Sequence, residues 1–225
     1  MPASASPLRF AINLGNAVLA KVLPDGSAGG MTVEIANRIA ATLNTVADFV
    51  TYHTAGNVVD DALQDVWDIA FLAVDPKREE VLRFTQPYIA IQGTVMVKAD
   101  SHWRSVEQMD REGVVINVGK GAAYDLQLSR ELQHATLNRL GSSQAAIDAF
   151  LNGEGDMAAG IRQPLERAAR ENQGFRVLPD NFGQINQAIC VPHKNTDLHG
   201  KITELLTQWQ QDGSVQCIIE RHFSE

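Results

Sequence analysis

The chain has 225 residues, of which 44% are hydrophobic and 20% are charged, so it can bury a full core as one large domain or two lobes. Its formal net charge of -8 and its pI near 5.2 disfavour nucleic acid and anionic membranes as partners, because both require a basic face. No stretch approaches the roughly 18 apolar residues of a membrane-spanning helix.

Strand and helix patterns alternate along the chain, which predicts an α/β fold with mainly parallel sheets. In the first part, strands are expected at residues 8–14, 46–52 and 69–74, and helices at residues 32–43 and 58–63. The apolar residues of the first helix recur at the spacing of one stripe that faces a sheet. Glycine and proline at residues 24–30 predict a hairpin-like loop.

After Tyr88 the α/β pattern starts again. Further strands are expected at residues 94–98, 114–118, 135–140, 157–160 and 185–191, and further helices at residues 123–132, 144–151 and 164–172. Residues 198–209 show helical spacing of apolar side chains, and Gly213 separates this helix from a last one that ends near Phe223.

A short segment around Arg78 combines a helix start with a cation. Asp75 and Pro76 are typical of an N-cap and a first helical position, and Pro87 prevents the helix from continuing. The helix dipole disfavours a cation in the first turn, which favours a role for Arg78 outside helix stability, such as binding a carboxylate through two parallel hydrogen bonds. A surface ion pair with Asp75 or Glu79 is the alternative.

Three runs of this region resemble the first-lobe signature of the family 3 extracellular solute-binding proteins, the polar amino-acid receptors of ABC importers. They are Trp-Asp-Ile-Ala at residues 67–70, Asp-Pro-Lys-Arg at residues 75–78 and Phe-Thr-Gln-Pro-Tyr at residues 84–88. The likeness extends from Phe10 to Phe223. It implies a bilobal periplasmic-binding-protein type II fold that binds a small carboxylate-bearing solute, without catalysis or cofactor. In that family the arginine of this segment holds the ligand carboxylate, and its position here is Arg78.

The resemblance also implies a domain organisation. The chain would pass between the lobes near residues 89–93 and near residues 191–194, so that residues 1–90 and 193–225 form lobe 1 and residues 91–192 form an inserted lobe 2. The ligand would bind between the lobes and close the cleft, and a monomer would deliver it to an ABC permease.

The same resemblance implies a periplasmic or extracytoplasmic location. Residues 1–7, Met-Pro-Ala-Ser-Ala-Ser-Pro, have neither the basic region nor the apolar region of a signal peptide. We therefore expect that the export signal has been removed from this chain.

The expected pocket departs from the family's amino-acid receptors. Many of these hold the ligand ammonium with an acidic side chain a few residues after a Gly-x-x-Asp-Ala strand, whereas Ile161 and Arg162 stand there in this chain. The position of an aromatic shelf falls near Asn16, and Ala73 replaces a hydroxyl residue before the arginine. Because burying an unpaired ammonium is costly, a ligand with two anionic groups is favoured, held by Arg78 and Arg162.

The candidate ligand-binding residues are small, polar or cationic. They are Asn13, Asn16, Ala73, Arg78, Lys120, Gly121, Ala122, Ala123, Ser143, Arg162 and Gln163.

Structural roles remain open for most of them. Arg162 could pair with Asp156 or Glu166, the two asparagines could stabilise turns, Lys120 could be solvated, and the serine pair at residues 142–143 could cap a helix.

Other chemistry has weaker support. The six histidines lack the paired spacing of a zinc site, and residues 119–124 lack the third glycine of a dinucleotide loop. No Gly-x-Ser-x-Gly motif occurs. An eliminating enzyme similar to cyclohexadienyl dehydratase, which has the same fold, and a sensory ligand-binding domain remain alternatives. The two cysteines, Cys190 and Cys217, are expected to be buried free thiols, although one disulfide is also open.

Overall fold

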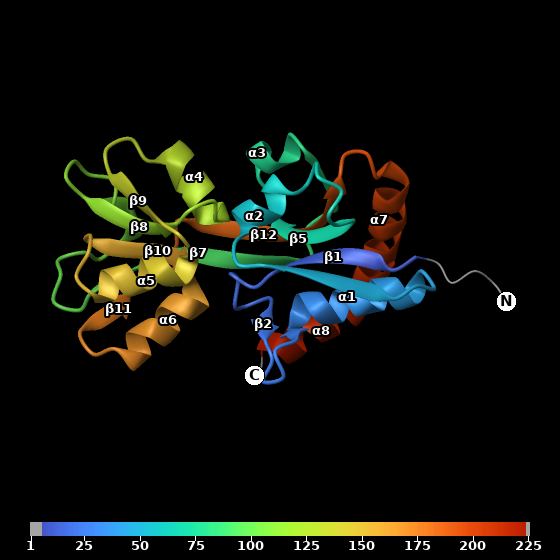
Figure 1. Ribbon diagram of the computed structural model, residues 1–225. Coiled ribbons are helices and arrows are strands. Elements are labelled where there is room, and N and C mark those ends of the chain that lie inside the picture. Colours follow the sequence, from blue (N-terminus) through green and yellow to red (C-terminus); the bar gives the residue numbers. More distant parts are fainter. Residues whose placement is uncertain (1–5, 224–225) are drawn as a thin grey trace. The chain divides into compact units, whose positions relative to one another are not determined.

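The computed structural model describes residues 6–223, so the expectation about the first seven residues largely concerns a segment outside this range. Two compact units divide the chain (Figure 1): unit 1 comprises Met1–Ile89 and Asn186–Glu225, and unit 2 comprises Ala90–Ile185. The second boundary lies seven residues earlier than the one expected after residue 192. The reason is strand pairing, because residues 187–192 pair with strands of unit 1.

Unit 1 is built on a sheet in which the strands follow the order β4-β1-β5-β12, and β6 also pairs with β12. The strands are β1 (Leu8–Asn13), β4 (Ala47–Tyr52), β5 (Ile69–Ala73), β6 (Leu82–Phe84) and β12 (Gly183–Pro192). β1 runs parallel to β4 and to β5, and β12 runs antiparallel to β5 and β6. All five residues of β5 are buried, as in a strand covered on both faces.

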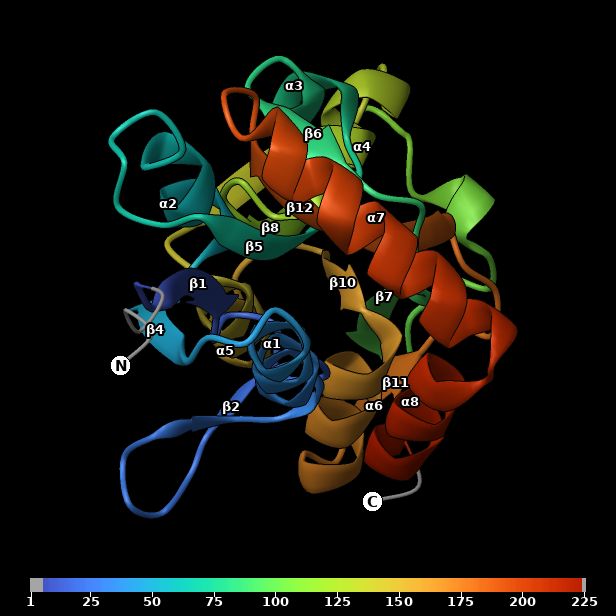
Figure 2. The ribbon, with the colours of Figure 1, turned by 90° about the vertical axis from the view of Figure 1, so that its right-hand side faces the viewer.

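Helices cover both faces of this sheet. They are α1 (Met31–Thr42), α2 (Ala55–Asp60), α3 (Pro76–Glu79), α7 (Thr196–Gln211) and α8 (Ser214–Phe223). α1 packs on β1 and β4, α7 packs on β6, and α8 packs on α1 and α7 (Figure 2). Val58 of α2 packs with Ala11 and Leu72 of the sheet. A hairpin of β2 (Lys21–Val22) and β3 (Ala28–Gly29) precedes α1.

Unit 2 has a sheet with the order β7-β10-β8-β9, and β11 also pairs with β7. The strands are β7 (Ile89–Lys98), β8 (Val115–Gly119), β9 (Thr136–Leu140), β10 (Met157–Ile161) and β11 (Phe175–Val177). β8 runs parallel to β9 and β10, whereas β7 runs antiparallel to β10 and β11.

Three helices and one short 3₁₀ turn, η1 (Val106–Gln108), complete unit 2. The helices are α4 (Ala123–Glu131), α5 (Ser143–Leu151) and α6 (Arg162–Glu171). α5 and α6 bury Phe150 and Leu165 against Met96 and Ala158 of the sheet, and α4 covers the other face (Figure 1). The predicted α/β architecture is thereby confirmed in each unit, but the expectation of mainly parallel sheets was wrong. Both sheets are mixed, because β12 runs antiparallel to β5 and β6, and β7 runs antiparallel to β10 and β11.

Some local expectations were wrong. α2 begins at Ala55 rather than at residue 58, because the Thr54 side chain caps it by accepting a hydrogen bond from the Asn57 amide at 3.2 Å. Both cysteines are free, but only Cys190 is buried. Cys217 is exposed because it lies on α8 away from the side that buries Val215 and Ile218. No helix within residues 6–223 is long and apolar enough to cross a membrane.

Candidate functional site

Three of the predicted site residues lie at one edge of the unit 1 sheet. β1 and β5 are parallel neighbours, so their last residues, Asn13 and Ala73, reach the same edge. α3, which carries Arg78, begins three residues after Ala73. The carboxyl ends of strands in α/β sheets are where ligands usually bind.

Arg78 is held firmly at this edge. Only 2% of the residue's surface is exposed. Nη1 donates a hydrogen bond to the Ala73 carbonyl at 3.0 Å. Burial lowers the pKa of the guanidinium from its usual value, whereas the nearby Asp75 carboxylate favours the charged form. A buried, oriented guanidinium is suited to carboxylates, because its planar donors match the two carboxylate oxygens.

The start of α3 follows the sequence prediction. The Asp75 side chain accepts a hydrogen bond from the Lys77 amide at 2.9 Å, and Pro76 occupies the first helical position. Cys190, on the neighbouring strand β12, lies close enough to Arg78 for the charge to favour the thiolate, but burial dominates and raises the pKa of the thiol. Cys190 is therefore a neutral core residue rather than a nucleophile.

The two predicted asparagines stabilise turns, which was the structural alternative. Oδ1 of Asn13 accepts from the Gly15 amide at 3.0 Å, and Oδ1 of Asn16 accepts from the Val18 amide at 3.3 Å. Both are side-chain turns of the kind that asparagine commonly forms after a strand.

In unit 2, the loop before α4 provides fewer amides for an anion than the sequence suggested. The Gly121 amide donates to Oδ2 of Asp125 at 2.9 Å, and the Ala122 amide donates to the Gly119 carbonyl at 3.1 Å. Ala123 is the first residue of α4, and the Lys120 side chain is exposed, as expected of a solvated lysine. A carboxylate of the protein itself already lies at this helix start.

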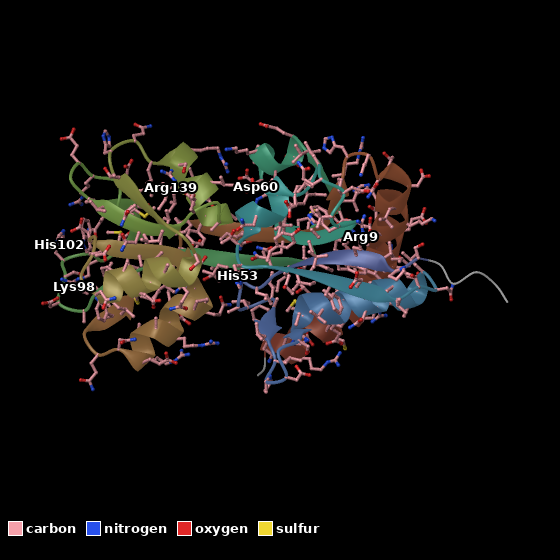
Figure 3. All side chains as sticks on the ribbon, in the orientation of Figure 1. Arg9, His53, Asp60, Lys98, His102 and Arg139 are labelled. Carbon is pink, nitrogen blue, oxygen red and sulfur yellow. The ribbon has the colours of Figure 1, made fainter. Side chains whose placement is uncertain are left out.

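Asp125 was missed by the sequence reasoning. It is 3% exposed. Arg139, which is labelled in Figure 3, donates from Nε to Oδ1 of Asp125 at 2.9 Å and from Nη2 to Ser129 Oγ at 2.8 Å. The signal was present, since an acidic residue at the third position of a helix often accepts from the amides that precede it.

The predicted serine contacts a tyrosine. Ser143 Oγ accepts a hydrogen bond from the Tyr124 hydroxyl at 2.8 Å, and that hydroxyl accepts from the Gly119 amide at 3.2 Å. Ser142 caps α5 by accepting from the Ala145 amide at 3.0 Å, which confirms that the serine pair marks a helix start.

Arg162 is engaged within unit 2. Nε donates to Gln92 at 2.7 Å, and Nη1 lies 3.2 Å from the Leu178 carbonyl and 3.5 Å from Glu166. Nη2 donates to the carbonyls of Pro179 and Asp180, at 3.2 and 2.7 Å. Because protein acceptors take up every nitrogen of the guanidinium, this geometry argues against Arg162 as the second anchor of a diacid. The alternative of an ion pair with Glu166 describes the structure better.

Two buried polar atoms have no hydrogen-bond partner within the described part of the chain. They are Oε1 of Gln163, on the first turn of α6, and the hydroxyl of Tyr88. An unpaired buried acceptor costs about 1–3 kcal/mol, so such atoms are candidates for contact with a ligand. Among residues 6–223, no group of three or more His, Cys, Asp or Glu side chains is arranged to hold a metal.

The two α/β units define a protein with the type II periplasmic-binding-protein fold. An ancestral arginine-binding protein bound to arginine matches with a TM-score of 0.84 and 18% identity, over 97% of this chain and 99% of that chain. A mutant of ArgBP from T. maritima matches with a TM-score of 0.82 and 21% identity, over 97% and 95%. The ancestral amino acid-binding protein AncCDT-1, a precursor of cyclohexadienyl dehydratase, matches with a TM-score of 0.82 and 18% identity, over 96% and 95%.

Residues 8–225 match the family model of the bacterial extracellular solute-binding proteins, family 3, and the chain belongs to this family. Among characterised relatives, the amino-acid-binding protein AabA of Dichelobacter nodosus is 21% identical over 204 residues, which cover 88% of this chain and 80% of that protein. The L-cystine-binding protein TcyJ of Escherichia coli K12 is 22% identical over 202 residues, covering 88% and 76%. Both relatives are binding proteins by name.

Proposed function

We propose that this chain is the extracytoplasmic receptor of an ABC importer and binds a small solute that carries a carboxylate, with Arg78 as the carboxylate anchor. Family membership supports the role in solute binding. We propose that the receptor acts as a monomer and that its macromolecular partner is the importer's permease.

The observation that carries this proposal is the placement of Arg78. The guanidinium is buried, is oriented by the Ala73 carbonyl and lies at the carboxyl edge of the unit 1 sheet. It is also the residue that the family motif assigns to the carboxylate. A charged hydrogen bond to a carboxylate gains strength in such a desolvated position.

The hydrogen bonds of unit 2 bear on the class of solute. Arg162 already interacts with Glu166, Gln92 and backbone carbonyls, and the amides of the loop before α4 already donate to Asp125 and Gly119. A second anionic group of the solute would therefore gain little from these donors. The unpaired Oε1 of Gln163 is an acceptor that suits an N–H donor of the solute. We therefore propose an α-amino acid or a close relative in preference to a diacid, which revises the expectation from the sequence. The amino-acid-binding and cystine-binding relatives support the same class.

A thermal-shift panel tests the solute class. It contains the proteinogenic amino acids, cystine, and monocarboxylic and dicarboxylic acids without an amino group. Because a solute that binds only the folded state raises the melting temperature, an amino acid is expected to give the largest rise. A larger rise with dicarboxylates would reject the amino-acid assignment, and no rise with any compound would reject the carboxylate solute.

Calorimetry on variants tests the anchor with the best solute from the panel. Arg78→Ala should weaken binding by about 2–5 kcal/mol, since one side of a desolvated charge pair is removed. Arg83→Ala is the matched control, because Arg83 lies on the adjacent strand β6 and is exposed. An unchanged Kd in Arg78→Ala would exclude Arg78 as the anchor.

The role of Gln163 is tested separately. Gln163→Leu should weaken binding of the amino acid about tenfold, as expected for the loss of one buried hydrogen bond. It should leave the affinity for the analogue without the α-amino group nearly unchanged. Equal effects on both compounds would show that Gln163 does not accept from the amino group.

A further inference from the structure

His193, directly after β12, contacts the end of the helix that carries Arg78. Its Nε2 lies 3.0 Å from the Glu79 carbonyl and 3.0 Å from the Leu82 carbonyl. Because both partners are acceptors, Nε2 must carry the proton and donate to them. Glu79 is the last residue of α3, so its carbonyl is one of those left without a partner inside the helix.

Strand pairing fixes where His193 lies. Pro192 pairs with Leu82 and Val191 with Arg83 in the antiparallel ladder between β12 and β6. The His193 amide extends this ladder by donating to the Val81 carbonyl at 3.2 Å. The imidazole is therefore brought to α3 by a segment more than a hundred residues further along the chain.

α3 needs such external support. It has four residues, far fewer than an isolated helix requires, because the first helical turn costs more entropy than its single hydrogen bond returns. Asp75 caps its N-terminus through the Lys77 amide. At the other end, the His193 imidazole holds the Glu79 carbonyl, one residue after Arg78.

We propose that His193 is a positioning residue for Arg78: by capping the C-terminus of α3 it keeps the guanidinium in the orientation that binds the solute carboxylate. The consequence for binding rests on the proposed function of Arg78, whereas the consequence for α3 itself does not. A residue that holds a binding group in place affects affinity without touching the solute.

Hydrogen exchange of the protein without solute tests the structural step. The amides of Arg78, Glu79 and Val81 donate within the α3 turn, to carbonyls of Asp75 and Arg78, so their exchange reports on this helix. His193→Ala should speed their exchange roughly tenfold. His199→Ala is the matched control, because His199 Nε2 contacts the Phe84 carbonyl at 2.9 Å, beyond α3. Equal exchange at these three amides in His193→Ala and wild type would overturn the proposal.

Binding and rescue test the functional step. His193→Ala should weaken binding of the best solute of the panel roughly fivefold to twentyfold. His193→Gln, whose amide can donate to both carbonyls, should restore the affinity to within about threefold of the wild type. If His193→Ala does not fold, His193→Asn, which is too short to reach both carbonyls, takes its place. Faster exchange together with unchanged affinity in both His193→Ala and Arg78→Ala would reject the role of Arg78 and leave the cap standing. Unchanged affinity in His193→Ala alone would overturn the positioning role.

Discussion

Arg139 and Asp125 form an ion pair at the start of α4, with 2.9 Å between Nε and Oδ1. The Asp125 side chain is 4% exposed and that of Arg139 is 43% exposed, so the carboxylate is buried while its partner reaches solvent. The same carboxylate holds the Gly121 amide, which links β9, α4 and the loop between β8 and α4.

Removing Arg139 should destabilise the protein, because Asp125 would remain buried with fewer partners. We expect Arg139→Ala to lower the free energy of unfolding by about 1–3 kcal/mol, a range that allows for the solvent screening of the exposed arginine. Lys194→Ala is the control, since Lys194 pairs with Asp65 at 2.7 Å on the surface and should cost less than about 1 kcal/mol. Urea denaturation measures both, and equal losses would contradict the role of burial.

Two buried tyrosines, Tyr124 and Tyr88, should differ in how the loss of the hydroxyl group changes the stability of the protein. Tyr124 is hydrogen-bonded to Ser143 and Gly119, so Tyr124→Phe should cost about 1–2 kcal/mol of stability. The Tyr88 hydroxyl has no partner among the described residues, so Tyr88→Phe should leave stability unchanged or raise it. Thermal denaturation without solute compares the two variants, and a large loss in Tyr88→Phe would show that its hydroxyl is satisfied.

The stabilising effect of Asp110 should depend on pH. Its carboxylate accepts hydrogen bonds from the backbone amides of Ala135, Gln133 and His134, which hold the pKa below its usual value. A carboxyl group whose pKa is lower in the folded state stabilises that state above its unfolded pKa, about 3.9, and loses this effect as pH falls through the folded pKa.

Asp110→Asn should therefore melt at a lower temperature than the wild type at pH 7, and this gap in melting temperature should stay constant until pH falls to about 4, the unfolded pKa, and should shrink below that pH. Melting curves from about pH 7 to about pH 3 measure the gap. A gap that stays constant over this whole range would show that the charge of Asp110 does not contribute.

The two cysteines should differ in reactivity. Cys217 is exposed, whereas Cys190 is fully buried and burial raises the pKa of its thiol. A thiol reagent should modify one thiol per molecule in the native protein and two in the denatured protein. Two rapidly reacting thiols in the native state would mean that β12 opens readily, and none in the denatured state would indicate a disulfide.

The sequence predicted the elements whose periodicity extends over several residues. β1, α1 and α7 follow from regular apolar spacing, and β5 follows from a continuous apolar run. β6 and β11 were missed because three residues are too few to show alternation, and both exist through pairing with distant strands.

The candidate site was less predictable, because side-chain partners come from distant segments. Motif and cap rules identified Arg78 and the Asp75 cap, which depend on neighbours within a few residues. Nothing local indicated that Arg162 would donate to the carbonyls of residues 178–180, or that Arg139 would lie beside Asp125. Such contacts are set by the packing of whole elements.

The pairing of β5 with β12 has a consequence for biosynthesis. Residues 70–73 of β5 pair with residues 187–190 of β12, so the partner strand is translated 114 to 120 residues later along the chain. At a synthesis rate of about 5–20 residues per second, β12 is translated roughly 6–24 seconds after β5. During that interval one edge of an entirely apolar strand, Ile-Ala-Phe-Leu-Ala, stays unpaired, and such edges readily join other chains. This edge of β5 can therefore be covered by its partner strand only after unit 2 has been synthesised.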